Sequence, residues 1–122
     1  MAGGHIVEAL PGAERIRVEI GGRIVAESDR PVLVHETGMP VRYYLPPQDV
    51  ALELFEPTAT RTHCPFKGDA SYWSYRDGEG RVLADVVWAY TDPLHGVALI
   101  KDHLCFYDTK ARIVVDTPAG AG

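Results

Sequence analysis

The sequence lacks a long apolar run, an excess of basic residues and a leader-like N-terminus. No stretch approaches the ~20 apolar residues that a membrane-spanning helix needs, and no basic patch precedes an apolar run as in a secretory signal. Lys and Arg number 12 against 17 Asp and Glu, for a net charge of -5, whereas duplex binding needs clustered cations. We therefore expect a soluble, cytoplasmic protein that binds neither membrane nor nucleic acid.

Metal-binding and common catalytic motifs are also missing. The two cysteines, Cys64 and Cys105, are widely separated, so the sequence neither requires nor forbids their pairing. Structural zinc takes four ligands at paired short spacings, but the chain has no CxxC and its five histidines are dispersed. It also has no GxSxG elbow, P-loop or dinucleotide fingerprint. We predict no metal and no cofactor.

The carboxylates are spread along the chain, mostly at predicted turns. Nucleotidyl transfer with two metal ions requires acidic side chains clustered around the ions. The sequence therefore gives no motif for that reaction, and we interpret most of these acids as solvated surface charge.

What the sequence does contain is the pattern of an antiparallel β protein. Its 122 residues, 46% of them hydrophobic, suffice for one domain. Apolar and charged residues alternate in Arg15–Ile20, and Gly21-Gly22 then joins this run to Arg23–Ser28, which predicts a hairpin. Further strands are predicted at 31–36, 41–45, 71–76, 81–90, 97–101, 104–107 and 112–116.

The predicted fold class is mainly β, in antiparallel sheets with at most one or two short helices. One such helix is expected within 47–54, where a proline occupies its first turn. We expect residues 1–14 to be a loose lead-in, 15–116 a single β-rich domain and 117–122 a frayed tail.

The segment THCPFKGDASYW (residues 62–73) gathers the most reactive side chains. Cys64 has cations nearby that would lower a thiol pKa, although a free cysteine is more often a small buried residue. Gly68 is expected to form a tight turn that holds the ammonium of Lys67 near the mouth of the sheet. There Lys67 would bind an anion or, if desolvated, lose its proton. The alternative is an ion pair with Asp69 or a side chain that snorkels to solvent.

Aromatic residues crowd the strands on either side of the predicted 77–80 turn. Alternation puts Tyr72 on one face and Trp73 and Tyr75 on the other, while Trp88 and Tyr90 share a face. Such aromatics are most often core residues. Their hydroxyls and indole N–H groups nevertheless need partners, so some are expected to line a wet, partly apolar cleft of the kind that binds small molecules.

Four segments resemble, in order, the family called domain of unknown function 427: VRYYLPPQDV, THCPFKGDASYW, VVWAYTDP and LIKDHLCFY. The resemblance covers about residues 30–116, and its central element T-x-C-P-x-K-G-x-A-x-Y is matched without gaps. The family often carries the label nucleotidyltransferase, which the carboxylate pattern does not support.

The resemblance implies a β-tent fold, in which two antiparallel sheets lean together. Proteins said to share that fold include the thalidomide-binding domain of cereblon and the B-type methionine sulfoxide reductases. Many of them carry a four-cysteine zinc site, which this chain lacks. Fold alone does not license function, so these proteins supply only hypotheses.

The leading hypothesis is a small-molecule site in an aromatic-lined cleft between sheets. We expect it to be built by Tyr44, Thr62, Tyr72, Trp88 and Tyr90 as ligand-binding residues, with Cys64 and Lys67 as the catalytic groups if a reaction occurs. The alternatives are a thiol-dependent enzyme that uses Cys64, with Cys105 as its one candidate resolving thiol, and a homodimeric interaction module that pairs through an exposed sheet edge.

Overall fold

The structure, a computed structural model, describes residues 4–117 of the chain. Within them the elements are β1 (Val7–Pro11), β2 (Arg15–Ile20), β3 (Arg23–Ser28), β4 (Val32–Glu36), β5 (Arg42–Tyr44), the 3-10 helices η1 (Pro47–Asp49) and η2 (Leu52–Leu54), β6 (Phe55–Cys64), β7 (Gly68–Arg76), β8 (Val82–Tyr90), the 3-10 helix η3 (His95–Ile100), β9 (Cys105–Phe106) and β10 (Arg112–Asp116). The predicted tail at 117–122 lies, apart from Thr117, outside the described residues.

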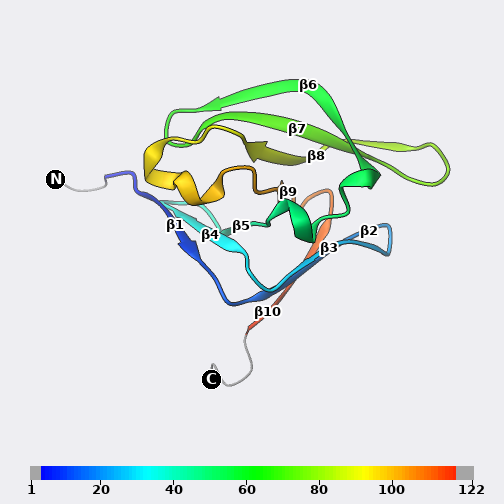
Figure 1. Cartoon of the computed structure of the whole chain (residues 1–122), viewed down its shortest axis with the longest axis horizontal. Helices are drawn as coiled ribbons and strands as arrows, with labels where there is room; N and C mark the ends of the chain where they lie inside the picture. Colours follow the sequence, from blue (N-terminus) through cyan, green and yellow to red (C-terminus); the bar gives the residue numbers. More distant parts are fainter. Residues whose placement is uncertain (1–3, 118–122) are drawn as a thin grey trace.

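The strands form three antiparallel sheets, ordered β1-β4-β5, β10-β2-β3 and β6-β7-β8-β9. Figure 1 shows β6, β7 and β8 running together above, with β1 and β4 below them at one end and β2 and β3 at the other. The prediction of a mainly β fold in antiparallel sheets is confirmed. The β-tent described above has two sheets, whereas hydrogen bonding here divides the strands into three.

The β2–β3 hairpin forms where the alternation predicted it. Ile16, Val18 and Ile20 are buried, and the charged residues between them are more exposed. The turn residues Gly21 and Gly22 have φ of 58° and 82°, the left-handed values that a two-residue hairpin turn requires. The prediction of this hairpin is confirmed.

Two segments adopt a structure other than the predicted one, and a third, Phe55–Cys64, forms a strand that was not predicted. Val7–Pro11, expected within a loose lead-in, forms β1 and pairs with β4. Residues 97–101, expected as a strand, lie largely in η3, because a short apolar run does not by itself distinguish a strand from a buried helical turn. Val97 and Ile100, three residues apart, are the buried pair of this helix, as expected for three residues per turn.

The longest strand, β6 (Phe55–Cys64), was not predicted. It is the edge strand of its sheet and mostly exposed, so its sequence lacks the apolar alternation of a half-buried strand. It carries Pro57 and a break in register between Pro57 and Arg61, features that discourage pairing of an edge with another chain.

The helix expected within 47–54 is two 3-10 turns, η1 and η2, and η3 brings the number in the described residues to three. None of these helices is long and apolar enough to cross a membrane.

Two hydrophobic clusters share strand β8 between them. Val87 and Ala89 belong to the first cluster, which also contains the core residues of β2. Trp88 and Tyr90 belong to the second, which we call the tyrosine cluster; its buried members are Val32, Val34, Tyr44, Ala70, Tyr72, Trp88, Tyr90, Val97, Ile100 and Cys105. Alternation over residues 87–90 of β8 thus separates the two sets, while Val86 also belongs to the first cluster. The tyrosine cluster joins β4 and β5 to β7 and β8.

Candidate functional site

A cavity of about 180 Å³ opens beside the tyrosine cluster; we call it the aromatic cleft. It lies between the β4–β5 hairpin of one sheet and strands β7 and β8 of another. Its lining residues are Glu36, Met39, Arg42, Tyr44, Lys67, Tyr72, Trp88, Tyr90 and Tyr107.

The structure brings the seven sequence-predicted site residues together at this cleft. Five line it directly: Tyr44, Lys67, Tyr72, Trp88 and Tyr90. The other two, Thr62 and Cys64, do not line the cleft but contact residues that do. A hydrogen bond of 2.8 Å joins Thr62 Oγ1 to the Tyr72 hydroxyl, and Cys64 Sγ lies 3.8 Å from Lys67 Nζ.

The central motif forms the tight loop that presents Lys67. Strand β6 ends at Cys64 and β7 begins at Gly68, and the Lys67 N–H donates to the Cys64 carbonyl at 3.2 Å. Gly68 has φ of 117°, a value that residues with a Cβ rarely adopt. A Cβ at Gly68 would also lie 3.3 Å from the Asp92 carbonyl oxygen. The glycine therefore lets the loop fold against the chain after β8.

Lys67 is paired with a carboxylate that the sequence analysis did not single out. Its Nζ donates to Glu36 Oε1 at 2.6 Å, and Lys67 is only 8% exposed. The alternative of an ion pair with Asp69 is wrong: in the structure Asp69 bonds the exposed ring of His63 instead. The partner, Glu36, is 31 residues away at the end of β4 and lines the cleft. The ion pair therefore holds the ammonium at the cleft.

The charge of Glu36 is maintained by its hydrogen bonds. Burial opposes its ionisation, but hydrogen bonds from Lys67 and His5 outweigh burial and hold the pKa of Glu36 below its ordinary value. His5 Nε2 lies 2.9 Å from Glu36 Oε2, and the His5 ring stacks on Phe66 beside the loop. Both carboxylate oxygens are thus engaged, by different partners.

The tyrosine hydroxyls of the cleft differ in their hydrogen-bond partners. The Trp88 indole N–H donates to the Tyr44 hydroxyl at 3.0 Å, and the hydroxyls of Tyr72 and Tyr107 are 3.4 Å apart. The hydroxyl of Tyr90, a residue 6% exposed, has no hydrogen-bond partner among the described residues. Burial raises the pKa of Tyr44 and of Tyr90 above the usual value and that of Tyr107 to about 12. At neutral pH Tyr44, Tyr90 and Tyr107 therefore keep their protons.

Arg42 supplies a second cation that the sequence analysis missed. Its guanidinium lies 5.5 Å from the centre of the Trp88 ring, a cation–π arrangement, and 4.0 Å from Asp108. A signal for it was present, because Arg42 is two residues from Tyr44 and therefore shares its face of β5. No local pattern pointed to Glu36, Met39 or Tyr107, which reach the cleft through tertiary packing.

The two thiols differ in environment. Both cysteines are free; Cys64 is partly exposed and Cys105 is buried. Burial raises the pKa of Cys105 to about 12, so it remains a protonated thiol. A group in that state is a poor resolving nucleophile, which disfavours two-cysteine chemistry.

A larger hollow of about 560 Å³ lies elsewhere, between the β2–β3 turn and the far end of the β7–β8 hairpin. Its main carboxylate, Asp77, already accepts hydrogen bonds from the N–H groups of Glu79 and Arg81 and from the Arg81 side chain. Size alone favours this hollow as a binding site, and it also has a buried tyrosine, Tyr75, whose hydroxyl has no hydrogen-bond partner among the described residues, but it lacks the buried ammonium of the aromatic cleft.

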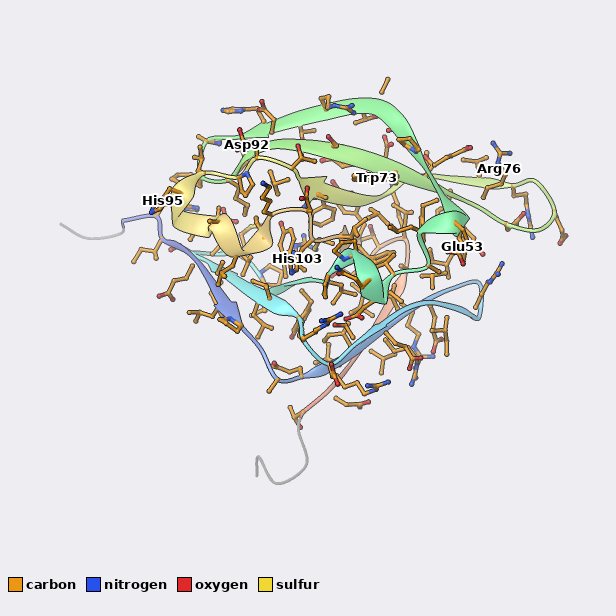
Figure 2. All side chains as sticks on the ribbon, viewed as in Figure 1. Glu53, Trp73, Arg76, Asp92, His95 and His103 are labelled. Atoms are coloured by element: carbon orange, nitrogen blue, oxygen red, sulfur yellow. The ribbon has the colours of Figure 1, made fainter. Side chains whose placement is uncertain are left out.

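Possible metal ligands are dispersed. Figure 2 shows Asp92 and His95 at one end of the molecule and Glu53 toward the other, with His103 between them. The part of the chain that the structure describes contains no group of three or more His, Cys, Asp or Glu side chains placed to hold a metal ion.

Comparison with known proteins gives one family. The model of the family NTP_transf_9, described as a domain of unknown function (DUF427), matches residues 8–117. No curated protein matches the chain.

Proposed function

The chain belongs to the DUF427 family, whose description assigns no activity, and we propose that it binds a small molecule in the aromatic cleft. The family name refers to nucleotidyl transfer, but the dispersed carboxylates of the described residues supply no cluster on which to base that reaction. The proposal is therefore founded on the geometry of the cleft.

The observation that carries the proposal is the Tyr90 hydroxyl beside the buried ammonium of Lys67, since both residues line the same cleft. Only 6% of Tyr90 is exposed, yet its hydroxyl lacks a hydrogen-bond partner among the described residues. No side-chain polar atom of the described residues is fully buried without a partner, so this hydroxyl stays open to the cleft that Tyr90 lines. A bound ligand would provide the missing partner there.

The size of the cleft limits the ligand. Pockets for drug-sized molecules measure about 300–1,000 Å³, and the aromatic cleft measures about 180 Å³. The ligand is accordingly a compact molecule, or a compact group of a larger one whose remainder stays in solvent.

The two tryptophans provide an internal test. Trp88 lines the cleft, whereas Trp73 packs against the first cluster. A library of small neutral, anionic and cationic compounds is titrated into the Trp73→Phe and Trp88→Phe variants while tryptophan fluorescence is followed. The proposal predicts saturable changes only in Trp73→Phe, which retains Trp88.

Compounds that change the fluorescence of Trp88→Phe but not that of Trp73→Phe would move the site away from the cleft. A complete lack of response in both variants, with folding verified by circular dichroism, would refute small-molecule binding there.

Thiol chemistry at Cys64 is a second candidate, favoured by the 3.8 Å contact between its Sγ and Lys67 Nζ. A nearby ammonium stabilises the thiolate, which is the reacting form. The rate of alkylation by iodoacetamide at neutral pH should then fall in Lys67→Met and stay unchanged in the control Lys101→Met. Equal rates in Lys67→Met and the parent protein would remove this candidate.

A further inference from the structure

We infer that the ligand of the aromatic cleft is a small carboxylate with a flat apolar body, of the size of benzoate. This inference rests on the proposed function and specifies its ligand. It follows from three properties of the cleft: its unused hydrogen-bond donors, its local charge and the shape of its walls.

The cleft offers donors and almost no free acceptors. The Tyr44 hydroxyl accepts from Trp88, and its own proton has no acceptor among the described residues. The Arg42 guanidinium carries five N–H donors, and none of them makes a side-chain hydrogen bond within residues 4–117. Together with the Tyr90 hydroxyl, which can donate as well as accept, these groups favour a ligand that accepts hydrogen bonds.

The charged acceptor of the cleft is already engaged. Glu36 is the one carboxylate that lines the cleft, and its two oxygens accept hydrogen bonds from Lys67 and His5. A ligand rich in donors, such as an amine, would have to compete with those contacts. A ligand rich in acceptors finds free partners at once.

The cations of the cleft differ in how firmly they are paired. Lys67 is held by the partly buried carboxylate of Glu36 at 2.6 Å, whereas the carboxylate beside Arg42, that of Asp108, is 4.0 Å away and largely exposed. An exposed ion pair contributes little, so Arg42 is the cation with which an anionic ligand can pair.

Shape separates a carboxylate from other anions. A guanidinium presents two parallel N–H groups that match the two oxygens of a carboxylate or phosphate. Beside Arg42 the walls are flat rings: Trp88 lies under its guanidinium, and the Tyr107 ring centre is 4.4 Å from that of Trp88. A flat hydrocarbon part fits against these rings, and inorganic phosphate has none. The volume of about 180 Å³ excludes a whole nucleotide.

Isothermal titration calorimetry with three probes tests the inference: benzoate, its neutral analogue benzamide, and inorganic phosphate. We expect benzoate to bind at least about tenfold more tightly than either of the others, because only benzoate combines charge with a flat apolar body. Arg42→Gln is expected to weaken benzoate binding at least about tenfold, as for loss of a charged hydrogen bond.

Tyr90→Phe gives the sharpest variant, because it removes a hydroxyl that has no partner in the described fold. It should unfold at the same temperature as the parent protein or slightly higher, and bind benzoate about five- to tenfold more weakly. The matched control is Tyr75→Phe: Tyr75 is buried to the same degree but belongs to the first cluster. Its affinity for benzoate should equal that of the parent protein.

The possible failures are distinguishable. If benzamide or phosphate binds as tightly as benzoate while compounds still report through Trp88, the ligand class is wrong and the proposed function stands. Benzoate binding that Tyr90→Phe and Arg42→Gln leave unchanged would place the carboxylate site elsewhere and overturn the inference. If no neutral or charged compound reports through Trp88, both proposals fail.

Discussion

Replacing Gly68 with alanine should destabilise the protein more than the same replacement at Gly21 or Gly96, because two costs coincide at Gly68. Its φ of 117° lies outside the left-handed region that residues with a Cβ reach most readily. The added Cβ would also stand 3.3 Å from the carbonyl oxygen of Asp92, so either the loop or the chain after β8 must shift. Because Gly68 follows Lys67, that shift would also displace the ammonium in the cleft.

The magnitude follows from the backbone. An unfavourable φ costs about 1–3 kcal/mol, and the lower entropy of the unfolded alanine variant returns about 0.4–1 kcal/mol. With the close contact added, we expect Gly68→Ala to lower the free energy of unfolding by about 2–3 kcal/mol. Unfolding entropy of about 2.1 cal/mol/K per residue over 122 residues converts this to a fall in Tm of about 8 to 12 °C.

Two control variants separate the contributions. Gly21 also has a positive φ, of 58°, but a Cβ there would meet nothing within 4 Å, so Gly21→Ala isolates the backbone term, at about 0–1.5 kcal/mol. Gly96 has neither a positive φ nor a close neighbour, and Gly96→Ala should be neutral or slightly stabilising. Thermal unfolding of the three variants is followed by circular dichroism. A Gly68→Ala variant as stable as Gly96→Ala would refute the account of this loop.

Three further perturbations test the rest of the account. Glu36→Gln removes the counterion of Lys67 and should lower the free energy of unfolding by about 1–3 kcal/mol in urea titrations. The control Glu56→Gln, in an exposed pair, should change it by less than about 0.5 kcal/mol. Equal effects would contradict a partly buried pair between Lys67 and Glu36. Burial raises the pKa of Tyr90 above its ordinary value of 10.0, so its contribution to stability is complete below that value and is lost as the pH rises beyond it. The urea midpoint should therefore fall above about pH 10, and a midpoint that stays constant up to about pH 12 would be evidence against this. Asp85, at φ of 50°, accepts hydrogen bonds from two threonine hydroxyls. In thermal unfolding, Asp85→Ala should lower the free energy of unfolding by about 1–2 kcal/mol, and Asp85→Asn should lower it less. The reverse order would show that these bonds contribute nothing.

Much of the fold could be predicted because period-two patterns mark half-buried strands. Alternation separated Tyr72 from Trp73 and put Trp88 and Tyr90 on one face, and in the structure β7 pairs with β8 so that Tyr72 lies opposite Trp88. The turn at Gly68 was predictable as well, since a glycine follows Lys67 directly within the reactive segment. Local patterns thus sufficed for the residues contributed by this hairpin and its preceding loop.

The rest of the cleft depends on contacts between distant segments. The sequence suggested Asp69, two residues away, as a partner for Lys67, whereas the actual partner Glu36 is 31 residues away. Which carboxylate reaches the ammonium is decided by the packing of β4 and β5 against β7 and β8, and no short pattern encodes that packing. Arg42 was missed although it shares a face of β5 with Tyr44, because its importance comes from the Trp88 ring beneath it.

The segments predicted incorrectly have a different cause. The apolar run within η3 is too short for its period to distinguish a strand from a helical turn, and β6 is an exposed edge with few apolar residues. In β1 the burial is only partial, so its hydrophobic signal is weak. These elements owe their structure to the neighbours against which they pair or pack.

The central claim, that the aromatic cleft is the ligand site, is tested most directly by the indole N–H signals of the two tryptophans in a nitrogen-15 correlation spectrum. Trp88 lines the cleft and its N–H donates to the Tyr44 hydroxyl, so a ligand in the cleft should alter the environment of that signal. During a benzoate titration the Trp88 signal should move and saturate while the Trp73 signal stays in place. A stationary Trp88 signal at saturating benzoate, or equal movement of both signals, would contradict the claim.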